Sequence, residues 1–165
     1  HGFALITEER KANGLFLKGD ITFNTTIANM NHYKNGAVLS HDRMVRATAE
    51  EIKIMHTKCM GPDDMITSLS GGNQQKVLLG KWVRDDAKIL MFDEPTHGVD
   101  IHAKQEIYSI IRNAAKNGAG VIVVSSELDE LIELSDRIIM INNGQIVGEK
   151  TQKPFNDQEI LSAIS

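Results

Sequence analysis

Short apolar runs alternate along the chain with segments whose apolar residues recur at helical spacing. The runs typical of buried strands occupy residues 3–7, 89–92, 121–124 and 138–141. Helices are predicted over residues 25–33, 42–57, 72–85, 101–116, 127–134 and 157–164. Asn143 and Gly144 predict a tight hairpin turn that leads into residues 145–147.

The two longest predicted helices each carry one apolar face. In the first, this face holds Val45, Ala49, Ile52 and Met55, and in the second it holds Ala103, Ile107, Ile110 and Ala114. We expect both faces to point into a core. Four methionines in the helical region, Met44, Met55, Met60 and Met65, fit either a core or a contact with a partner protein.

Helices that alternate with wholly apolar strands predict an α/β fold whose mostly parallel sheet is covered on both faces. The helical stretch over residues 24–85 lies between the first two strands and is too long for a simple crossover. We therefore expect a helical subdomain that is inserted into a sheet part made of residues 1–23 and 86–165.

Composition is that of an ordinary soluble domain of 165 residues, with 41% apolar and 24% charged residues. The net charge of −4, without blocks of like charge, argues against nucleic acid as a partner. Cys59 is alone, which excludes a disulfide framework. No apolar run approaches the ~18 residues that a membrane span needs. The chain begins at His1 without an initiator Met, so we expect it to be a piece of a longer protein.

Two carboxylates end the apolar run in "ILMFDEPT". Ligands collect at the carboxyl ends of parallel strands, where Asp93 is placed to hold Mg²⁺. Glu94 can orient and deprotonate an attacking water, and Pro95 fixes the turn. The alternative is an acidic strand end that is merely solvated.

The stretch "LSGGNQQK" places a hydroxyl and two glycines at the start of a helix. Ser70, Gly71 and Gly72 could bind phosphate there, because backbone N–H groups and the positive end of the helix dipole attract anions. The alternative is a serine N-cap followed by flexible glycines.

The usual phosphate-gripping loop, G-x-x-x-x-G-K-[ST], does not occur in this sequence. The nearest approach is Gly80 with Lys81, which is followed by Trp82. His97 and His102 match no zinc-ligand spacing. The sequence thus holds groups that could complete a nucleotide site, without the loop that grips the nucleotide.

Together these motifs resemble the ATP-binding cassette (ABC) ATPases, whose signature motif is followed by the Walker B strand and the D-loop. The variant "LSGGNQQKV" with "DEPTHGVD" and "VVSSELDEL" is similar to the second cassette of the double-cassette subunits that power bacterial monosaccharide importers. The stretches "GFALITEERKANGL" and "NHYKNG" are most similar to the galactose/methyl-galactoside type.

This resemblance implies nucleotide-binding roles for several residues. Ser70, Gly71 and Gly72 match the signature motif, which in the family contacts the γ-phosphate of ATP held by the opposing cassette. Asp93 matches the Walker B aspartate that binds Mg²⁺, and Glu94 matches the catalytic glutamate.

The resemblance also implies roles for three segments between strands. Glu8 stands where most cassettes have the Q-loop glutamine. Residues 97–100, ending at Asp100, match the D-loop that crosses the cassette dimer. Ser126 stands where most cassettes place the switch histidine, and serine cannot act as an imidazole donor. His97 and His102 replace the Arg and Gly that sugar-importer relatives often carry.

By this resemblance the chain is a partial ABC nucleotide-binding domain, a RecA-like P-loop NTPase sheet without its phosphate-loop strand. Its implied cofactors are ATP and Mg²⁺. Its implied partners are a second cassette, integral membrane permease subunits and, indirectly, a periplasmic sugar-binding protein, with no nucleic acid. The implied location is the cytoplasmic face of the bacterial inner membrane. The rival readings are an importer of another sugar, such as ribose or xylose, and a non-hydrolytic regulatory cassette.

The missing loop leads to two expectations. The chain alone should neither bind ATP tightly nor hydrolyse it. In the family the phosphate-loop strand lies between the strands that correspond to residues 121–124 and 138–141. Two strand edges then lack a partner, so we expect the chain to close the gap by rearrangement or to oligomerise through it.

Overall fold

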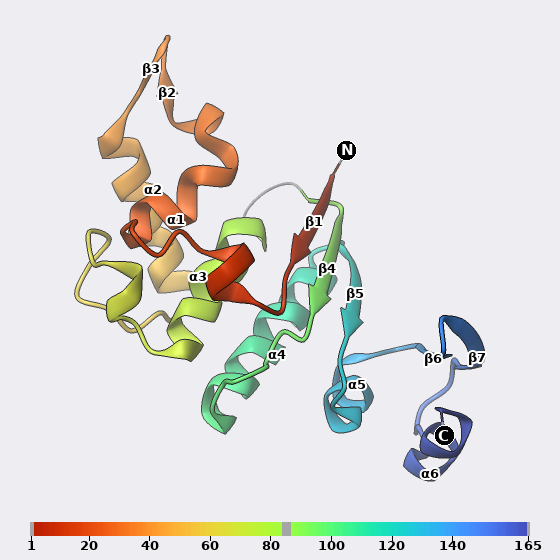
Figure 1. Ribbon diagram of the computed structural model, residues 1–165. Helices are drawn as coiled ribbons and strands as arrows, with labels where there is room; N and C mark the ends of the chain where they lie inside the picture. The colour runs from red at the N-terminus through yellow and green to blue at the C-terminus, as the bar shows by residue number, and fades with distance from the viewer. Residues whose placement is uncertain (1, 84–86, 165) are drawn as a thin grey trace.

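The computed structural model describes residues 2–83 and 87–164 (Figure 1). Its strands are β1 (Phe3–Ile6), β2 (Lys34–Asn35), β3 (Val38–Leu39), β4 (Ile89–Asp93), β5 (Gly120–Val124), β6 (Ile138–Asn142) and β7 (Gln145–Lys150). Its α-helices are α1 (Ile21–Thr26), α2 (His41–Ile54), α3 (Gly71–Val83), α4 (Ile101–Lys116), α5 (Leu128–Leu134) and α6 (Asp157–Ile164). Three short helices of other types are η1 (Arg10–Gly14), η2 (Ile27–Tyr33) and η3 (Ile66–Ser68).

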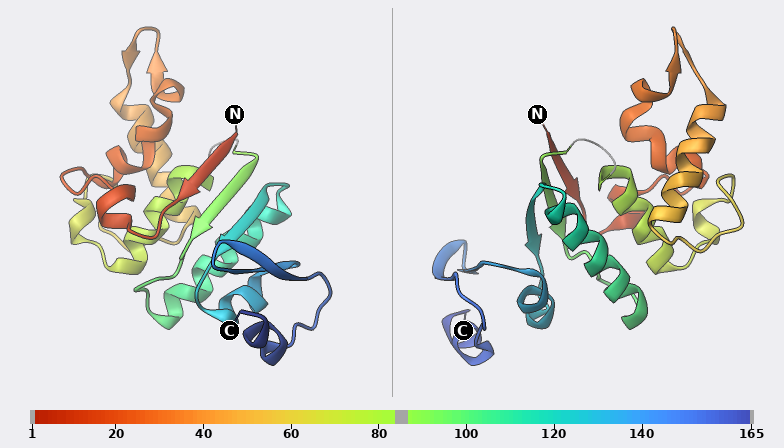
Figure 2. Two further views of the ribbon diagram at one scale, coloured as in Figure 1. Left: turned by 45° about the vertical axis from the view of Figure 1, so that its right-hand side comes forward. Right: turned by 180° about the vertical axis from the view of Figure 1, so that it is seen from behind.

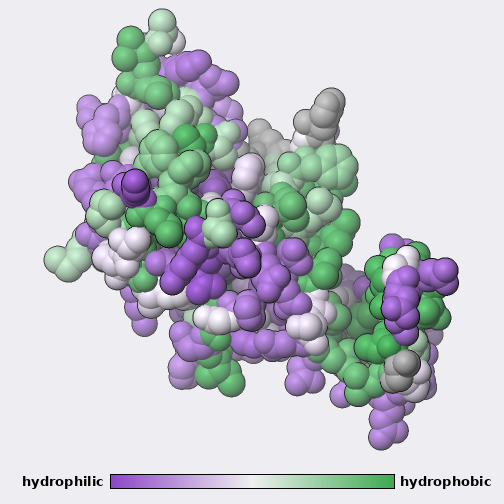
Figure 3. Space-filling model, viewed as in Figure 1, coloured by the Kyte–Doolittle hydropathy of each residue, from purple (hydrophilic) through white to green (hydrophobic). Residues whose placement is uncertain are grey.

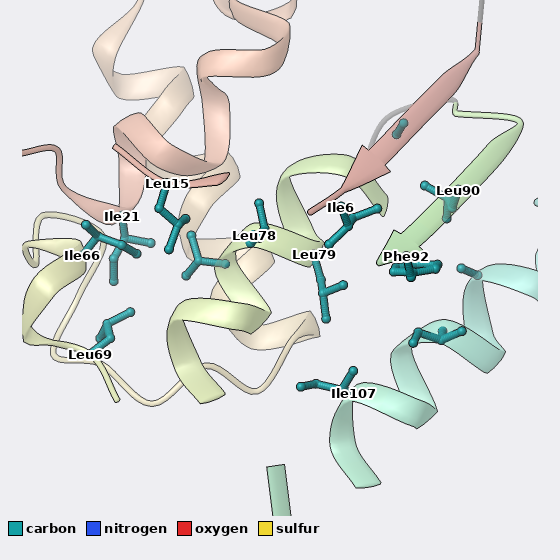
Figure 4. Close-up of a cluster of buried hydrophobic side chains, with 14 residues drawn as sticks. Ile6, Leu15, Ile21, Ile66, Leu69, Leu78, Leu79, Leu90, Phe92 and Ile107 are labelled. Atoms are coloured by element: carbon teal, nitrogen blue, oxygen red, sulfur yellow. The ribbon is translucent and has the colours of Figure 1, made fainter. Parts of the chain in front are cut away.

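The predicted parallel sheet is present and has three strands in the order β1-β4-β5. Its buried face carries Ala4 and Ile6 from β1 and Leu90 and Phe92 from β4. These side chains pack with α3 and α4 in the main hydrophobic cluster, part of which Figure 4 shows. The α/β class and the central position of β4 follow from this arrangement.

The opposite face of the sheet is exposed in the described residues. Phe3, Leu5, Ile122 and Val124 alternate with the buried positions and form an apolar area over the strands (Figure 3). The expectation that both faces are covered is therefore wrong for this part of the chain, because α3 and α4 pack on the same side of the sheet (Figure 2).

The helical region differs from its prediction in two places. The helix predicted over residues 25–33 starts earlier, because Phe23 N–H donates to Asp20 Oδ1 at 2.6 Å and caps α1, and η2 then follows. The helix predicted over residues 72–85 is α3, and the end of that prediction lies outside the described residues.

Helix α2 forms as predicted, but a different face is buried. The buried residues are Met44, Ala47, Thr48 and Glu51, and Met55 follows at the C-cap. Val45, Ala49 and Ile52 lie only half-buried at the side of this face. The polar Glu51 is accommodated because Gly80 of α3 has no side chain: a methyl group built there would lie 2.6 Å from Glu51 Oε1.

Helix α4 forms over the predicted residues. Asp100 caps its start, and Gly118, with φ of 95°, follows its end. The buried face holds Ala103, Ile107, Tyr108, Ile111 and Ala114, so Ile110 is replaced by its neighbour Ile111. The sequence thus predicted the bounds of this helix correctly and placed one residue of its buried face one position too early.

Strands β6 and β7 form a separate antiparallel hairpin through Asn143 and Gly144, whose positive φ values suit the predicted turn. Ile138 and Met140 of β6 pack with α5 and α6 around Phe155 and Ile160, in the part of the molecule at the lower right of Figure 1. Among the described residues no strand pairs with the outer edge of β5, so rearrangement does not close the predicted gap in this structure. Within the same residues, no helix is both long and apolar enough to cross a membrane.

Candidate functional site

An acidic turn, residues 93–96, lies at the carboxyl end of β4 and next to the edge strand β5. Asp93 is the last residue of β4, and Glu94 adopts a left-handed conformation with φ of 47°. Glu94 N–H donates to Val124 O at 2.9 Å, and Ser126 N–H donates to Glu94 Oε1 at 2.6 Å. The predicted residues Asp93, Glu94 and Ser126 are thus brought together by the ends of two neighbouring strands.

The Asp93 carboxylate is suited to be one ligand of a metal ion whose other ligands come from elsewhere. It is partly exposed, and no side chain among the described residues donates a hydrogen bond to it. The same residues contain no cluster of three or more His, Cys, Asp or Glu side chains that could hold a metal on its own. A Mg²⁺ ion at Asp93 would therefore take its other ligands from phosphate oxygens and water, which is its usual coordination in nucleotide sites.

Ser70 precedes the first turn of α3 and is exposed. Its hydroxyl accepts from Asn73 Nδ2 at 2.9 Å, while Asn73 Oδ1 accepts from Lys58 N–H at 2.9 Å. The serine therefore binds a side chain instead of capping the backbone. The first N–H groups of the helix have no acceptor within the helix, so they are available to donate to a phosphate. The phosphate-binding role stays a prediction.

Gly71 and Gly72 allow close approach at this helix start. A methyl group built on Gly72 would lie 2.7 Å from Ala103 Cβ, so α3 and α4 touch here. One built on Gly71 would lie 2.8 Å from Arg10 Nη2 and 3.5 Å from Gly98 O. The signature segment of residues 70–72 therefore lies against residues 98–103 of the same chain.

Arg10 is a residue that the sequence analysis missed. Its Nη1 donates to His97 O at 3.0 Å, and its guanidinium lies beside Gly71. The predicted Glu8 lies nearby, with Oε1 3.5 Å from His97 Nδ1. These contacts join the segment after β1 to the predicted D-loop. No local pattern marks Arg10, because His97 is 87 residues away along the chain.

Asp100 is the N-cap of α4. Its Oδ1 accepts from His102 N–H at 3.1 Å and from Ala103 N–H at 3.0 Å. The hydrogen bond from Ala103, followed by that from His102, lowers the pKa of this carboxyl from its ordinary value of 3.8. Within this chain Asp100 thus positions a helix, and its predicted nucleotide contact stays a prediction.

A buried polar cluster lies behind the acidic turn and was also missed. Thr96 Oγ1 donates to Glu130 Oε1 at 2.8 Å, and each residue is only 1% exposed. Tyr108 of α4 packs beside them, and burial together with the charge of Glu130 raises its pKa to about 12. At the surface, Lys104 forms an ion pair with Glu127 at 2.5 Å. These contacts connect the turn, α4 and α5.

A shallow surface depression lies on the helical region, away from the acidic turn. It is lined by Phe16, Lys18, Gly19, Asp20, Phe23 and Met65. The rings of Phe16 and Phe23 meet edge to face, with centroids 5.3 Å apart. Of the four methionines in this region, Met44 and Met55 are core residues, while Met60 and Met65 are exposed. The core interpretation is therefore correct for Met44 and Met55, and contact with a partner stays a prediction for Met60 and Met65.

Comparison with known proteins gives three consistent results. The family model described as ABC transporter matches residues 6–97. The galactose/methyl galactoside import ATP-binding protein MglA of Treponema pallidum is 47% identical over 99% of this chain, and that of Escherichia coli K12 is 46% identical over all of it. This chain spans 33% of the length of each of these relatives.

Solved structures agree with the fold. A post-hydrolysis dimer of the ATP-binding cassette MJ0796, bound to ADP and Pi, matches with a TM-score of 0.76 at 19% identity, over 93% of this chain and 64% of that one. The fold class predicted from the sequence, a P-loop NTPase sheet with helical additions, is thereby confirmed. Since the family model spans more than half of the residues, the chain belongs to the ABC transporter family.

Proposed function

We propose that this chain is part of the ATP-hydrolysing subunit of a bacterial ABC importer that takes up a monosaccharide, galactose or methyl galactoside. The choice of sugar is based on the names of the relatives that are 46–47% identical over 99–100% of this chain. The hydrolytic role rests on one observation: Asp93 and Glu94 stand side by side at the carboxyl end of β4, with Ser126 N–H bonded to the Glu94 carboxylate.

The mechanism follows from these positions. Glu94 Oε1 is occupied by Ser126 N–H, which fixes the plane of the carboxylate and leaves Oε2 to accept a proton from attacking water. Asp93 would hold a nucleotide-bound Mg²⁺ through its carboxylate. When bound there, the ion would supply positive charge to the phosphate oxygens. The proton taken from water then resides on Glu94 until product release.

The signature segment, residues 70–72, serves a different nucleotide from the acidic turn. Its free backbone N–H groups and the Ser70 hydroxyl would contact the γ-phosphate of ATP held by an opposing cassette. Glu8 and Asp100 lie beside the same segments, through the Glu8–His97 contact and the cap of α4. The partner is therefore a second cassette, and ATP with Mg²⁺ is the shared ligand.

The other proposed partner is the membrane permease. The exposed side chains of Phe16 and Met65, with the half-buried ring of Phe23, line an apolar depression of the kind that receives a short helix from another protein. With a permease bound there, the cassette lies on the cytoplasmic face of the inner membrane, and a periplasmic sugar-binding protein acts indirectly, from the other side.

The test is Glu94→Gln in the full-length subunit assembled with its permease. We expect ATP turnover to fall roughly 100-fold while ATP binding persists, because glutamine keeps the shape but cannot accept the proton. Glu133→Gln is the matched control, since Glu133 is a half-exposed carboxylate of α5 whose ion pair, among the described residues, is with Arg112 at the surface. Uptake of labelled galactose, with ribose as competitor, tests the sugar in the same preparation.

A regulatory cassette is the second candidate, favoured by the serine at position 126 and by the hydrogen bond that already occupies Glu94. Under that alternative the Glu94→Gln variant keeps turnover within twofold of wild type. Absence of labelled galactose uptake, together with ATP turnover that is still lost in Glu94→Gln, would instead overturn the choice of sugar and leave the hydrolytic role in place.

A further inference from the structure

Two hydrogen bonds join the acidic turn to the segment that starts α5. Ser126 N–H donates to Glu94 Oε1 at 2.6 Å, and Thr96 Oγ1 donates to Glu130 Oε1 at 2.8 Å. Glu94 and Thr96 are two residues apart in the turn, while Ser126 lies just before α5 and Glu130 lies in its first turn. Both bonds therefore connect the same two segments.

The two bonds differ in their exposure to water. Ser126 is exposed, so the bond to Glu94 competes with solvent. Thr96 and Glu130 are each 1% exposed, and hydrogen bonds in such surroundings are stronger and more costly to break than exposed ones. The buried bond between Thr96 and Glu130 is therefore the more costly of the two to break.

Glu130 depends on Thr96 for its place. Among the described residues, its second oxygen, Oε2, is buried without a hydrogen-bond partner, so the Thr96 hydroxyl is the group that holds the carboxyl. Tyr108 of α4 packs against this pair, and burial, followed by the charge of Glu130, raises the pKa of its hydroxyl. Three elements, the turn, α4 and α5, therefore meet at one buried carboxyl.

We propose that Glu130 is a positioning residue for Glu94. By holding Thr96, it fixes the segment of residues 125–130 so that the main-chain N–H of Ser126 stays on the Glu94 carboxylate. The backbone thereby supplies the donor at the position where serine has no imidazole. This inference rests on the proposed function, in which Glu94 is the general base.

The experiment compares Thr96→Val with Thr96→Ser in the full-length subunit. Valine keeps the volume and removes the hydroxyl, whereas serine keeps the donor. We expect Thr96→Val to lower kcat about 10-fold or more, with KM for ATP changed less than twofold, because a displaced general base costs turnover and not ATP binding. Thr96→Ser should stay within twofold of wild type. Glu133→Gln on the same helix is the control for a surface carboxylate.

Hydrogen exchange of the nucleotide-free protein provides a readout that needs no turnover. Peptides that cover residues 125–131 should exchange faster in Thr96→Val and in Glu130→Ala, and at the wild-type rate in Thr96→Ser and Glu133→Gln. A protein in which Glu130 only supports the fold would lose midpoint temperature in both variants without a selective loss of kcat.

The outcomes separate the two proposals. Faster exchange with unchanged kcat in Thr96→Val overturns the positioning role and leaves the proposed function intact. Unchanged exchange and unchanged kcat overturn it as well. If Glu94→Gln keeps wild-type turnover, the proposed function is wrong and the positioning of a base falls with it. Loss of kcat and of protection, both restored by serine, supports the proposal.

Discussion

Gly72 marks the point where the signature helix α3 touches α4, and a single methyl group tests that contact. A Cβ built on Gly72 would lie 2.7 Å from Ala103 Cβ and 3.5 Å from Val99 Cγ1. Apolar carbon atoms pack best at about 3.5–4.0 Å. The Gly72→Ala variant must therefore separate the two helices by roughly 1 Å at this point, because a Cβ atom cannot rotate away.

The expected cost follows from two opposing effects. Overpacking of this kind destabilises a core by about 1–3 kcal/mol. Replacing glycine by alanine in a helix returns about 0.5–1 kcal/mol through backbone entropy. We expect Gly72→Ala to lose about 1–2 kcal/mol of unfolding free energy. Gly71→Ala is the matched control, because its Cβ would meet the terminal Nη2 of Arg10, a flexible side chain that can move aside.

Urea denaturation measures both variants, and a second substitution removes the clash. Ala103→Gly alone should cost about 1 kcal/mol through helix propensity. In the double variant, the loss should be smaller than the sum of the single losses by about 1 kcal/mol, since the two residues contact each other directly. Additive losses, or a Gly72→Ala variant as stable as wild type, would refute this account of the helix contact.

Two further predictions concern buried and capping charges. Lys76 is 2% exposed, and its Nζ donates to His56 O at 2.9 Å and pairs with Glu106 at 2.5 Å. Lys76→Met should therefore lose about 1–2 kcal/mol of unfolding free energy. Glu106 is half-exposed and can be rehydrated, so the control variant Glu106→Gln should lose less. A Lys76→Met variant more stable than wild type contradicts this. The pKa of Asp100 is lowered by folding, so its contribution is complete above the unfolded pKa of 3.8 and is lost as pH falls through the lower folded value. Asp100→Asn keeps the cap without titrating, so its urea midpoint should fall less than that of wild type on acidification, and parallel curves for the two proteins would exclude Asp100 as the source.

Elements whose signals are local were predicted well. The start of α4 depends on Asp100, its length on the spacing of Ala103 and Ile107, and its end on Gly118, and all of these lie within one stretch of sequence. Helix α1 shows that a local signal can also be overlooked, since the Asp20 cap sets its start.

Contacts between distant segments explain most of the errors. The buried face of α2 was misplaced because Glu51 fits against Gly80 of α3, and a hydrophobic pattern cannot include a glutamate. At the site, the acidic turn of Asp93 and Glu94 was visible as two carboxylates after an apolar run. The partners Thr96 and Glu130 are 34 residues apart, and no spacing rule relates them.

The hairpin β6–β7 was predicted from its turn, whereas the sheet to which β6 belongs was not. Residues 121–124 and 138–141 are equally apolar runs, and both were predicted to be strands of one sheet. Strand β5 pairs with β4, which precedes it across the helix α4. Strand β6 is followed directly by the turn of Asn143 and Gly144, which reverses the chain into β7. A partner two residues away costs far less loop entropy than one brought from elsewhere, so β6 pairs with β7. Apolarity thus determines that a strand forms, and the nearest turn or crossover determines the sheet to which it belongs.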